Sequence, residues 1–291
     1  MASRWRTFWW LLHQSLVSAY ENGALGTAKG AAYSALLSFF PLLTTLVALL
    51  AHANAERVSG TVARFFFRVV PPGTQDLIQQ TVFGRGERPL LLPIGGMLLS
   101  IWACSGLMAT LMEGFHAAYH IPINRSAVRE RAMAILLVLA AVVPVVGASA
   151  LIVFGNRLQG RMMNLIGLAP AGVPLEGGLL LLGEVLRYAI ALGAIILVNI
   201  LIYYLGPNRE QRWGDVWPGA ILATLLWLLA TSGFAWYARH IANYSLMYGS
   251  IGAVIALLVW MYLLSLIALI GCEFNANRER LAQALSRADS A

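Results

Sequence analysis

The sequence predicts an all-α membrane protein, a bundle of six transmembrane helices, and three observations lead to this class. Hydrophobic residues make up 59% of the 291 positions, and charged residues only 11%. An ordinary soluble domain carries about 25% charged residues, so this chain cannot cover a globular surface. Between the apolar runs, no connection is long enough for a soluble domain of about 50 residues or more. The composition excludes a soluble enzyme, a disordered protein and a disulfide scaffold, and we expect one polytopic membrane domain over residues 1–291.

Six charge-free runs are each long enough to cross a bilayer. They contain 21 to 33 residues between successive charged positions, whereas a helix needs about 20 apolar residues to cross the hydrocarbon core. We expect helices because backbone polar groups find no water in lipid, and because no short alternating pattern indicates a barrel. The expected spans lie near residues 31–51, 90–112, 132–154, 179–205, 216–238 and 248–272.

Two amphipathic segments flank the first span. In Ser3–Tyr20, tryptophan and leucine recur at helical spacing opposite two arginines, which predicts an N-terminal helix lying in the membrane interface. A signal peptide is the competing interpretation, and it is rejected because polar residues interrupt the apolar core. In Glu56–Val70, valine and phenylalanine share one helical face and arginine the other. This pattern predicts an amphipathic helix in the first extracytoplasmic loop.

The basic residues are scattered between apolar runs, although the formal net charge is +7. Scattered arginine is typical of membrane flanks rather than of a nucleic-acid surface, so we expect no nucleic-acid partner. With both termini in the cytoplasm, eleven basic residues fall on the cytoplasmic side and eight on the other, and this modest bias favours that orientation. Cys104 and Cys272 lie in apolar runs and fit neither a disulfide framework nor a zinc spacing.

Ionisable residues inside the spans are candidates for function because charge is costly in lipid. Glu184 and Arg187 are one turn apart at the start of the fourth span and share a helical face. They form either a self-contained ion pair or a polar patch for a charged head group or ion. Glu273 and Asn275 close the sixth span, and Tyr248 begins it. These three residues also suit an ordinary interfacial helix end.

A metal site at the end of the second span is the weaker of two interpretations. Glu113, His116 and His120 have a Glu-x-x-His spacing like that of di-iron bundles, but such bundles require a second copy of the motif, which the chain lacks. We therefore expect an interfacial helix end, with no metal and no cofactor.

Small residues and prolines predict closely packed and kinked helices. The small residues of the first span recur at every fourth position, a spacing that lets helices approach closely: Gly26, Gly30, Ser34 and Ser38. Pro41, Pro93 and Pro144 each remove a backbone hydrogen bond and should kink their helices. Kinks are common structural features, and they also border the movable segments of transporters.

Motifs at both ends of the chain resemble the YihY/BrkB family of bacterial inner-membrane proteins. The first is A-A-Y-x-x-L-L-S-x-x-P-L over residues 31–42, and the second is Y-G-S-I-G-A-x-I-x-L-L-x-W-M-Y over residues 248–262, followed by G-C-E-F-N over residues 271–275. Pro207, Trp213, Pro218-Gly219-Ala220 and Trp227 fit the middle of the pattern. The chain departs from the family at Cys272, where alanine is usual, and at Lys29, where we expect a neutral or polar residue.

The resemblance implies six transmembrane helices, an inner-membrane location and a role in the bacterial envelope. The family is similar to proteins labelled ribonuclease BN and to a factor linked with serum resistance. A ribonuclease is not favoured by the residues themselves, because metal-assisted cleavage needs clustered acidic or histidine ligands.

Two hypotheses follow. In the first, a transporter or flippase moves a lipid or another anionic envelope molecule through a cavity between the first, fourth and sixth spans. Arg187 and Lys29 attract the head group, while Glu184 and Glu273 supply counter-charge or relay protons. In the second, a scaffold docks envelope machinery through an apolar face, with membrane lipids and an envelope protein or a second copy as partners. The candidate residues of the substrate path are Lys29, Tyr33, Ser38, Glu184, Arg187, Tyr248, Glu273 and Asn275.

Overall fold

The computed structural model describes residues 2–52, 91–122, 125–166, 177–240 and 249–289, and every regular element in these ranges is a helix. In chain order the elements are α1 (Ala2–Glu21), α2 (Ala24–His52), α5 (Leu91–Tyr119), α6 (Ala127–Ile166), α7 (Gly177–Leu205), α8 (Trp213–His240) and α10 (Gly249–Asp289). The predicted all-α class is confirmed. The amphipathic helix expected in Glu56–Val70 and the candidate Tyr248 lie outside the described ranges.

Five of the helices are long and apolar enough to cross a membrane, so the chain is a multi-pass membrane protein. Within the described ranges, the qualifying segments are Ile94–Tyr119, Ala127–Ala148, Gly183–Leu205, Trp213–Tyr237 and Val254–Ala288. They correspond to the second through sixth predicted spans. The first predicted span lies in α2, which is not among the five, so the count of six stays a prediction.

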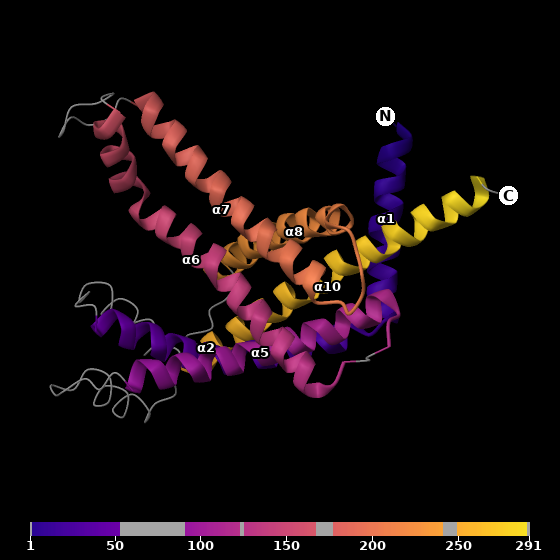
Figure 1. Cartoon of the computed structure of the whole chain (residues 1–291), viewed down its shortest axis with the longest axis horizontal. Coiled ribbons are helices and arrows are strands. Elements are labelled where there is room, and N and C mark those ends of the chain that lie inside the picture. Colours follow the sequence, from indigo (N-terminus) through magenta and orange to yellow (C-terminus); the bar gives the residue numbers. More distant parts are fainter. Residues whose placement is uncertain (1, 53–90, 123–124, 167–176, 241–248, 290–291) are drawn as a thin grey trace.

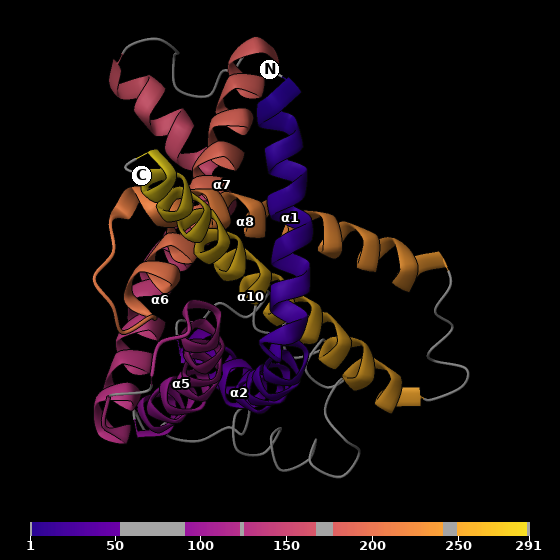
Figure 2. The ribbon, with the colours of Figure 1, turned by 90° about the vertical axis from the view of Figure 1, so that its right-hand side faces the viewer.

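Helices α2, α5, α6, α7, α8 and α10 pair into three hairpins that share one end. The pairs are α2 with α5, α6 with α7, and α8 with α10. The outer ends of the hairpins diverge from the shared end (Figures 1 and 2). Helix α10 is the central element, because it contacts α1, α2 and α5 as well as α8.

The pairing of α2 with α5 depends on small residues. A Cβ atom added at Gly30 would lie 3.3 Å from Cγ2 of Thr110, and one added at Gly96 would lie 2.7 Å from Oγ1 of Thr45. The prediction of a close-contact face is therefore confirmed at Gly30. At Gly26 the prediction is wrong, because an added Cβ would have no neighbour within 4 Å.

The prolines occupy two kinds of position. Pro41 and Pro144 lie inside α2 and α6, and both helices continue through them. Pro93 is the third residue of α5. A helix tolerates proline in its first turn, where the amide hydrogen has no intrahelical acceptor. The sequence position of Pro93 therefore marks the start of a helix rather than a kink within one.

The most tightly packed residues gather at the shared end of the hairpins. The buried side chains of one cluster come from all seven described helices, and the largest include Met112, Phe115, Leu137, Tyr203 and Leu269. The rings of Phe115 and Tyr203 meet edge to face, with their centroids 5.6 Å apart. This apolar core supports the polar residues described next.

Candidate functional site

Polar side chains from six parts of the chain meet at the shared end of the hairpins, and we call this group the polar hub. Its members come from the turn after α1, from α5, α6 and α10, and from the connections 120–126 and 206–212. The polar hub consists of Asn22, His116, Arg125, Glu130, Arg209, Gln211, Glu273, Asn275, Asn277, Glu279 and Arg280.

One polar face of α10 holds the helix against α1. Successive residues of a helix are 100° apart, so Glu273 and Asn277 share a face. Oε1 of Glu273 accepts a hydrogen bond of 2.6 Å from Nδ2 of Asn22. Nδ2 of Asn277 donates to Oγ of Ser18 over 3.2 Å. Asn22 can reach Glu273 because Gly23, with a φ of 74°, makes the tight turn between α1 and α2.

The opposite face of α10 carries Asn275, which binds the backbone of α8. Its Oδ1 accepts the amide hydrogen of Gly219 over 2.7 Å, and its Nδ2 donates to the carbonyl oxygen of Val216 over 3.0 Å. Between these residues lies Pro218, which has no amide hydrogen and disturbs regular helical bonding. Asn275, only 2% exposed, therefore satisfies two backbone groups beside the proline.

Helices α8 and α10 cross with their backbones almost in contact at two glycines. A Cβ atom added at Gly271 would lie 2.8 Å from the carbonyl oxygen of Gly219 and against the hydroxyl group of Tyr203. That hydroxyl group donates to the carbonyl oxygen of Ala268 over 2.8 Å. Only glycine allows two helix backbones to approach this closely.

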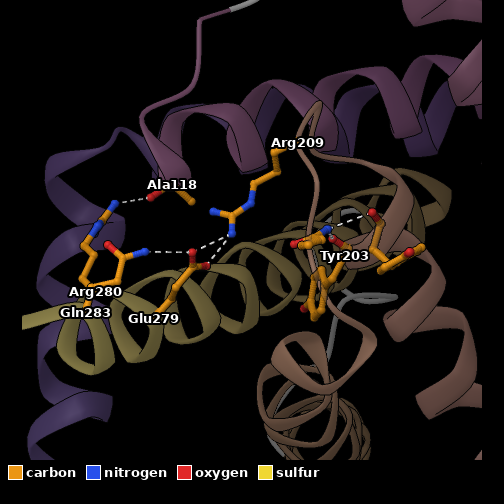
Figure 3. A network of polar contacts seen from close by, with 8 residues as sticks. Ala118, Tyr203, Arg209, Glu279, Arg280 and Gln283 are labelled. Carbon is orange, nitrogen blue, oxygen red and sulfur yellow. Dashed lines mark hydrogen bonds and ion pairs between the residues drawn. The ribbon is translucent and has the colours of Figure 1, made fainter. Parts of the chain in front are cut away.

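The connection 206–212 is tied to α10 by an ion pair. Nη2 of Arg209 donates to both carboxylate oxygens of Glu279, over 2.7 and 2.6 Å (Figure 3). The guanidinium carbon of Arg209 lies 4.3 Å from the centre of the Tyr119 ring. Nearby, Arg280 donates to the carbonyl oxygen of Ala118. Both arginines therefore join α10 to the end of α5.

His116 holds the same connection from the side of α5. Its Nε2 accepts the amide hydrogen of Asn208 over 3.3 Å. Its Nδ1 lies 3.9 Å from Oε1 of Glu130 on α6, which is too long for a hydrogen bond. The histidine is 2% exposed.

A pocket of about 290 Å³ lies beside this connection. Its lining combines two arginines, one glutamate and one glutamine with apolar and aromatic side chains: Arg125, Met133, Tyr204, Leu205, Pro207, Arg209, Glu210 and Gln211. Gln211 donates to the carbonyl oxygens of Tyr203 and Tyr204. Arg125 donates to the carbonyl oxygen of Gly206 over 3.3 Å. The pocket is thus built on a fixed stretch of backbone at the end of α7.

The structure places the predicted pair Glu184 and Arg187 far from the polar hub. Along α7, Glu184 lies about 29 Å and Arg187 about 24 Å from Tyr203, given a rise of about 1.5 Å per residue. Glu184 is exposed. Arg187 donates through Nε to the carbonyl oxygen of Gly183, one turn earlier in the same helix, over 3.0 Å. The described contacts include no ion pair between Glu184 and Arg187.

The remaining predicted residues divide between buried and exposed positions. Glu273 and Asn275 are buried in the polar hub, on opposite faces of α10. Ser38 is also buried and donates to the carbonyl oxygen of Ala35 over 2.8 Å. Lys29 and Tyr33 are exposed on α2. Lys29 is thus exposed, Glu273 is buried, and Arg187 lies about 24 Å along α7 from Tyr203, so the described contacts do not bring these three side chains together.

The Glu-x-x-His spacing does not bring its two side chains together. Glu113 is exposed while His116 is buried, so they do not present a common set of ligands. His120 directly follows α5, with a φ of 52°, and is exposed. In the part of the chain that is described, no group of three or more histidine, cysteine, aspartate or glutamate side chains could hold a metal ion.

Sequence reasoning missed several members of the polar hub. Asn277 continues the alternation of polar residues begun by Glu273 and Asn275, and this pattern at the end of an apolar run is the signal that could have found it. Arg209 and Glu279 are separated by 70 positions. Neither lies inside a predicted span, so the argument that charge is costly in lipid did not select them as candidates.

The fold and the polar hub define a multi-pass helical membrane protein in which His116, Glu273, Asn275 and Asn277 are buried at one end. The chain belongs to the Virulence factor BrkB family, whose sequence model matches residues 17–291. It is 28% identical over 255 residues to the putative ribonuclease-like protein YfkH of Bacillus subtilis, covering 86% of this chain and 89% of that protein. It is 26% identical over 273 residues to the UPF0761 membrane protein PSHAa0171 of Pseudoalteromonas translucida, covering 92% and 85%.

A third relative is the UPF0761 membrane protein of Tolumonas auensis, which is 39% identical over 103 residues, or 35% of this chain and 32% of that protein. No solved structure matches the chain. The family is one of membrane proteins rather than a recognised enzyme family. The word ribonuclease belongs to the name of YfkH alone among these three relatives.

Proposed function

We propose that the protein is a transporter or flippase of the bacterial inner membrane that moves a lipid or another anionic amphiphile of the envelope, without enzymatic activity. The observation that supports it best is the pocket in the polar hub. Arginine side chains and apolar side chains share its lining, which is the combination that an amphiphile requires. The substrate path inferred from the sequence, through Arg187 and Lys29, is replaced by one that begins at this pocket.

The two arginines of the pocket retain hydrogen-bond donors for an anion. A guanidinium group has five N–H donors. Arg209 uses Nη2 for Glu279, and Arg125 uses Nη1 for Gly206. Among the described contacts, neither arginine uses its Nε. Glu210 also lines the pocket and opposes an anion there, so we expect moderate affinity, which suits a molecule that must be released.

The apolar part of the lining suits the region of an amphiphile next to its head group. Met133, Leu205 and Pro207 line the same pocket as the arginines. On α6, Leu136, Val143 and Val146 are at least half exposed, as expected for side chains that face lipid. A head group in the pocket could therefore be held while its acyl chains remain in the bilayer beside α6.

The polar hub belongs on the cytoplasmic side of the membrane in this proposal. Its connections 120–126 and 206–212 carry Arg125, Arg209 and Arg212, and basic connections favour the cytoplasm. The end of α1 and the polar part of α10 meet in the same hub, so both termini belong on that side. The pocket would then receive head groups from the cytoplasmic leaflet.

Reconstitution of the full chain into vesicles of phosphatidylcholine and phosphatidylglycerol tests the proposal. Fluorescent phosphatidylglycerol and fluorescent phosphatidylcholine are followed separately by dithionite quenching, without nucleotide. We expect the protein to accelerate equilibration of the anionic lipid more than that of the zwitterionic lipid. Equal rates with and without protein for both lipids would overturn the function.

The residue assignment needs a matched pair of variants. Arg125→Gln removes a charge that lines the pocket, whereas Arg129→Gln removes an exposed charge four residues later on α6. Loss of one charge-assisted hydrogen bond, worth about 1.5–3 kcal/mol, predicts about a tenfold lower rate for Arg125→Gln. Arg129→Gln should keep the rate of the unmodified protein. Equal rates in both variants would remove the pocket from the transport path.

A scaffold that docks envelope machinery is the second candidate, and α1 favours it. Trp5, Trp9 and Trp10 are 63%, 52% and 53% exposed. Such a row of aromatic side chains suits either the membrane interface or a protein partner. If Trp5→Ala and Trp9→Ala together abolish co-purification of an envelope protein or a second copy but leave lipid transfer intact, docking is a separate function of α1. If neither is affected, α1 serves as an interfacial anchor.

A further inference from the structure

We infer that His116 is a proton-binding site, and that a second proton on its ring releases the connection 206–212 from α5. The inference concerns a hydrogen bond within the protein, and only its consequence for head-group binding rests on the proposed function. In this inference, proton binding at His116 changes the position of the backbone that lines the pocket.

The hydrogen bond from Asn208 defines the state of the histidine ring. The backbone amide of Asn208 can only donate, so Nε2 of His116 must accept and cannot carry a hydrogen atom. The single ring proton of the neutral histidine therefore lies on Nδ1. This nitrogen has no hydrogen-bond partner among the described residues.

A carboxylate oxygen that also lacks a hydrogen-bond partner lies near Nδ1 of the ring. Oε1 of Glu130 is buried and has no hydrogen-bond partner in the described part of the chain. It lies 3.9 Å from Nδ1 of His116, about 1 Å beyond hydrogen-bond distance. Two unsatisfied polar groups that face each other in a buried site are costly. A small movement that brings Nδ1 and Oε1 together would let them form a hydrogen bond.

A second proton supplies the reason for that movement. It would add to the lone pair of Nε2, because Nδ1 already carries hydrogen. Nε2 would then be a donor facing the amide hydrogen of Asn208, and two donors repel. The imidazolium ring would at the same time gain charge attraction to Glu130. Proton binding thus removes the contact to the connection 206–212 and strengthens the contact to α6.

The charges around His116 come from α5, α6 and α10 and from the connections 120–126 and 206–212. Burial of the ring opposes the imidazolium form most strongly, Glu130 of α6 favours it, and Arg125 of the connection before α6 opposes it. Glu113 lies one turn earlier on α5 and is exposed. On the far side of the connection, Arg209 pairs with Glu279 of α10, and Arg280 of α10 binds Ala118. Glu130 is therefore the one carboxylate in the described contacts that reaches the ring.

The connection that His116 holds also forms the pocket. Pro207 and Arg209 flank Asn208 in the chain, and both line the pocket. Release of Asn208 would leave the connection attached at Arg209 and Gln211, so its first half should move and its second half should stay. The position of Pro207 and of the Gly206 carbonyl that binds Arg125 would change with pH.

Hydrogen–deuterium exchange of the full chain in phosphatidylcholine vesicles tests the inference directly. Exchange of the peptide covering residues 206–212 is measured between pH 8 and pH 5 and divided by the rate of an unstructured peptide at each pH. Since one hydrogen bond is worth about 1 kcal/mol, we expect protection to fall about fivefold as the pH is lowered. Unchanged protection over this range would overturn the inference.

Variants separate His116 from other titrating groups. His116→Gln offers an amide oxygen that cannot be protonated in this range, and we expect its protection to be independent of pH. Glu130→Gln keeps the histidine but removes the counter-charge, so the fall should move to lower pH. His13→Gln, at an exposed position of α1, is the matched control and should behave as the unmodified protein. If the His116→Gln and unmodified proteins lose protection in parallel, the proton binds elsewhere.

The outcome is independent of lipid transfer. A pH-dependent release of the connection without any lipid transfer would leave the proton site in place and refute the proposed function. The opposite outcome has two parts: lipid transfer depends on Arg125, and the His116→Gln variant has the same pH profile of transfer and the same hydrogen–deuterium exchange as the unmodified protein. This outcome would support the proposed function and refute the proton site. If His116→Gln does not fold, Glu130→Gln takes its place, because it leaves the histidine ring and its hydrogen bond to Asn208 unaltered.

Discussion

The two ends of the hairpins are built differently. At the shared end, Glu273 and Asn275 are buried and hydrogen-bonded across helices. Toward the outer end of α7, Glu184 is exposed and Arg187 binds only a carbonyl group of its own helix. The helices of the three pairs converge at the first end and diverge toward the second (Figures 1 and 2).

The comparison shows that a charged residue within an apolar run can have either of two structural roles. A side chain that bonds within its own helix can be accommodated wherever the helix lies. A side chain that bonds to another helix fixes the position of both. We therefore expect the folding of this protein to depend on the polar hub and to be insensitive to the charged residues of the outer end, and the following variants test that difference from the largest effect to the smallest.

Substitution Gly271→Ala should have the largest effect on stability. The new Cβ atom would overlap the hydroxyl group of Tyr203 and approach the carbonyl oxygen of Gly219. Overpacking of this kind costs about 1–3 kcal/mol. The matched control is Gly193→Ala on α7, where an added Cβ has no neighbour within 4 Å and alanine favours the helix. Thermal unfolding in detergent should show a lower Tm for the first variant and an equal or higher Tm for the second.

Substitution Asn275→Ala should come next, because it leaves the amide hydrogen of Gly219 and the carbonyl oxygen of Val216 without their partner. A buried unsatisfied group costs about 1–3 kcal/mol. Asn275→Asp keeps an acceptor for Gly219 but places a carboxylate against the Val216 carbonyl group, so it should not rescue Tm. A Tm for Asn275→Ala equal to that of the unmodified protein would show that α8 is not held by this side chain.

Separation of Arg209 from Glu279 should have a smaller effect. The two side chains are 23% and 28% exposed, so solvent screens part of their attraction. A double-mutant cycle of Arg209→Gln and Glu279→Gln should give a coupling of about 0.5–1 kcal/mol that decreases at high salt. No coupling at low salt would mean that the ion pair does not help to hold the connection 206–212.

Loss of charge at the outer end should have the smallest effect. Glu184→Gln and Arg187→Gln should change stability by no more than about 0.5 kcal/mol, as is usual for surface substitutions, because Glu184 is exposed and Arg187 bonds only within its own helix. A marked fall in Tm for either variant would contradict the distinction between the two ends.

The sequence was sufficient for the architecture because the requirement for apolar length is strict. Of the six runs of 21 to 33 uncharged residues, five correspond to described helices that are long and apolar enough to cross a membrane, and the first lies in α2, which does not qualify. Glu273 and Asn275 could also be selected from the sequence, since polar residues stand out against an apolar run. Their roles could not, because each role depends on a partner more than 50 positions away.

Arg187 illustrates the limit of the same reasoning. Its position in an apolar run predicted either an ion pair with Glu184 or a polar patch for a head group, and the guanidinium group donates to the carbonyl oxygen of Gly183 in the preceding turn. A long side chain can satisfy itself within one helix, and no sequence pattern distinguishes this from a contact across helices. Arg125 and Arg209 were not candidates because they lie in basic connections, where arginine is expected on topological grounds alone.

The most direct test compares lipid transfer in two variants that each lose one arginine, one from either end of the hairpins. Arg125→Gln alters the pocket in the polar hub, and Arg187→Gln alters the outer end of α7. In vesicles containing fluorescent phosphatidylglycerol, we predict about tenfold slower transfer for Arg125→Gln and an unchanged rate for Arg187→Gln. Slower transfer for Arg187→Gln with an unchanged rate for Arg125→Gln would contradict the account.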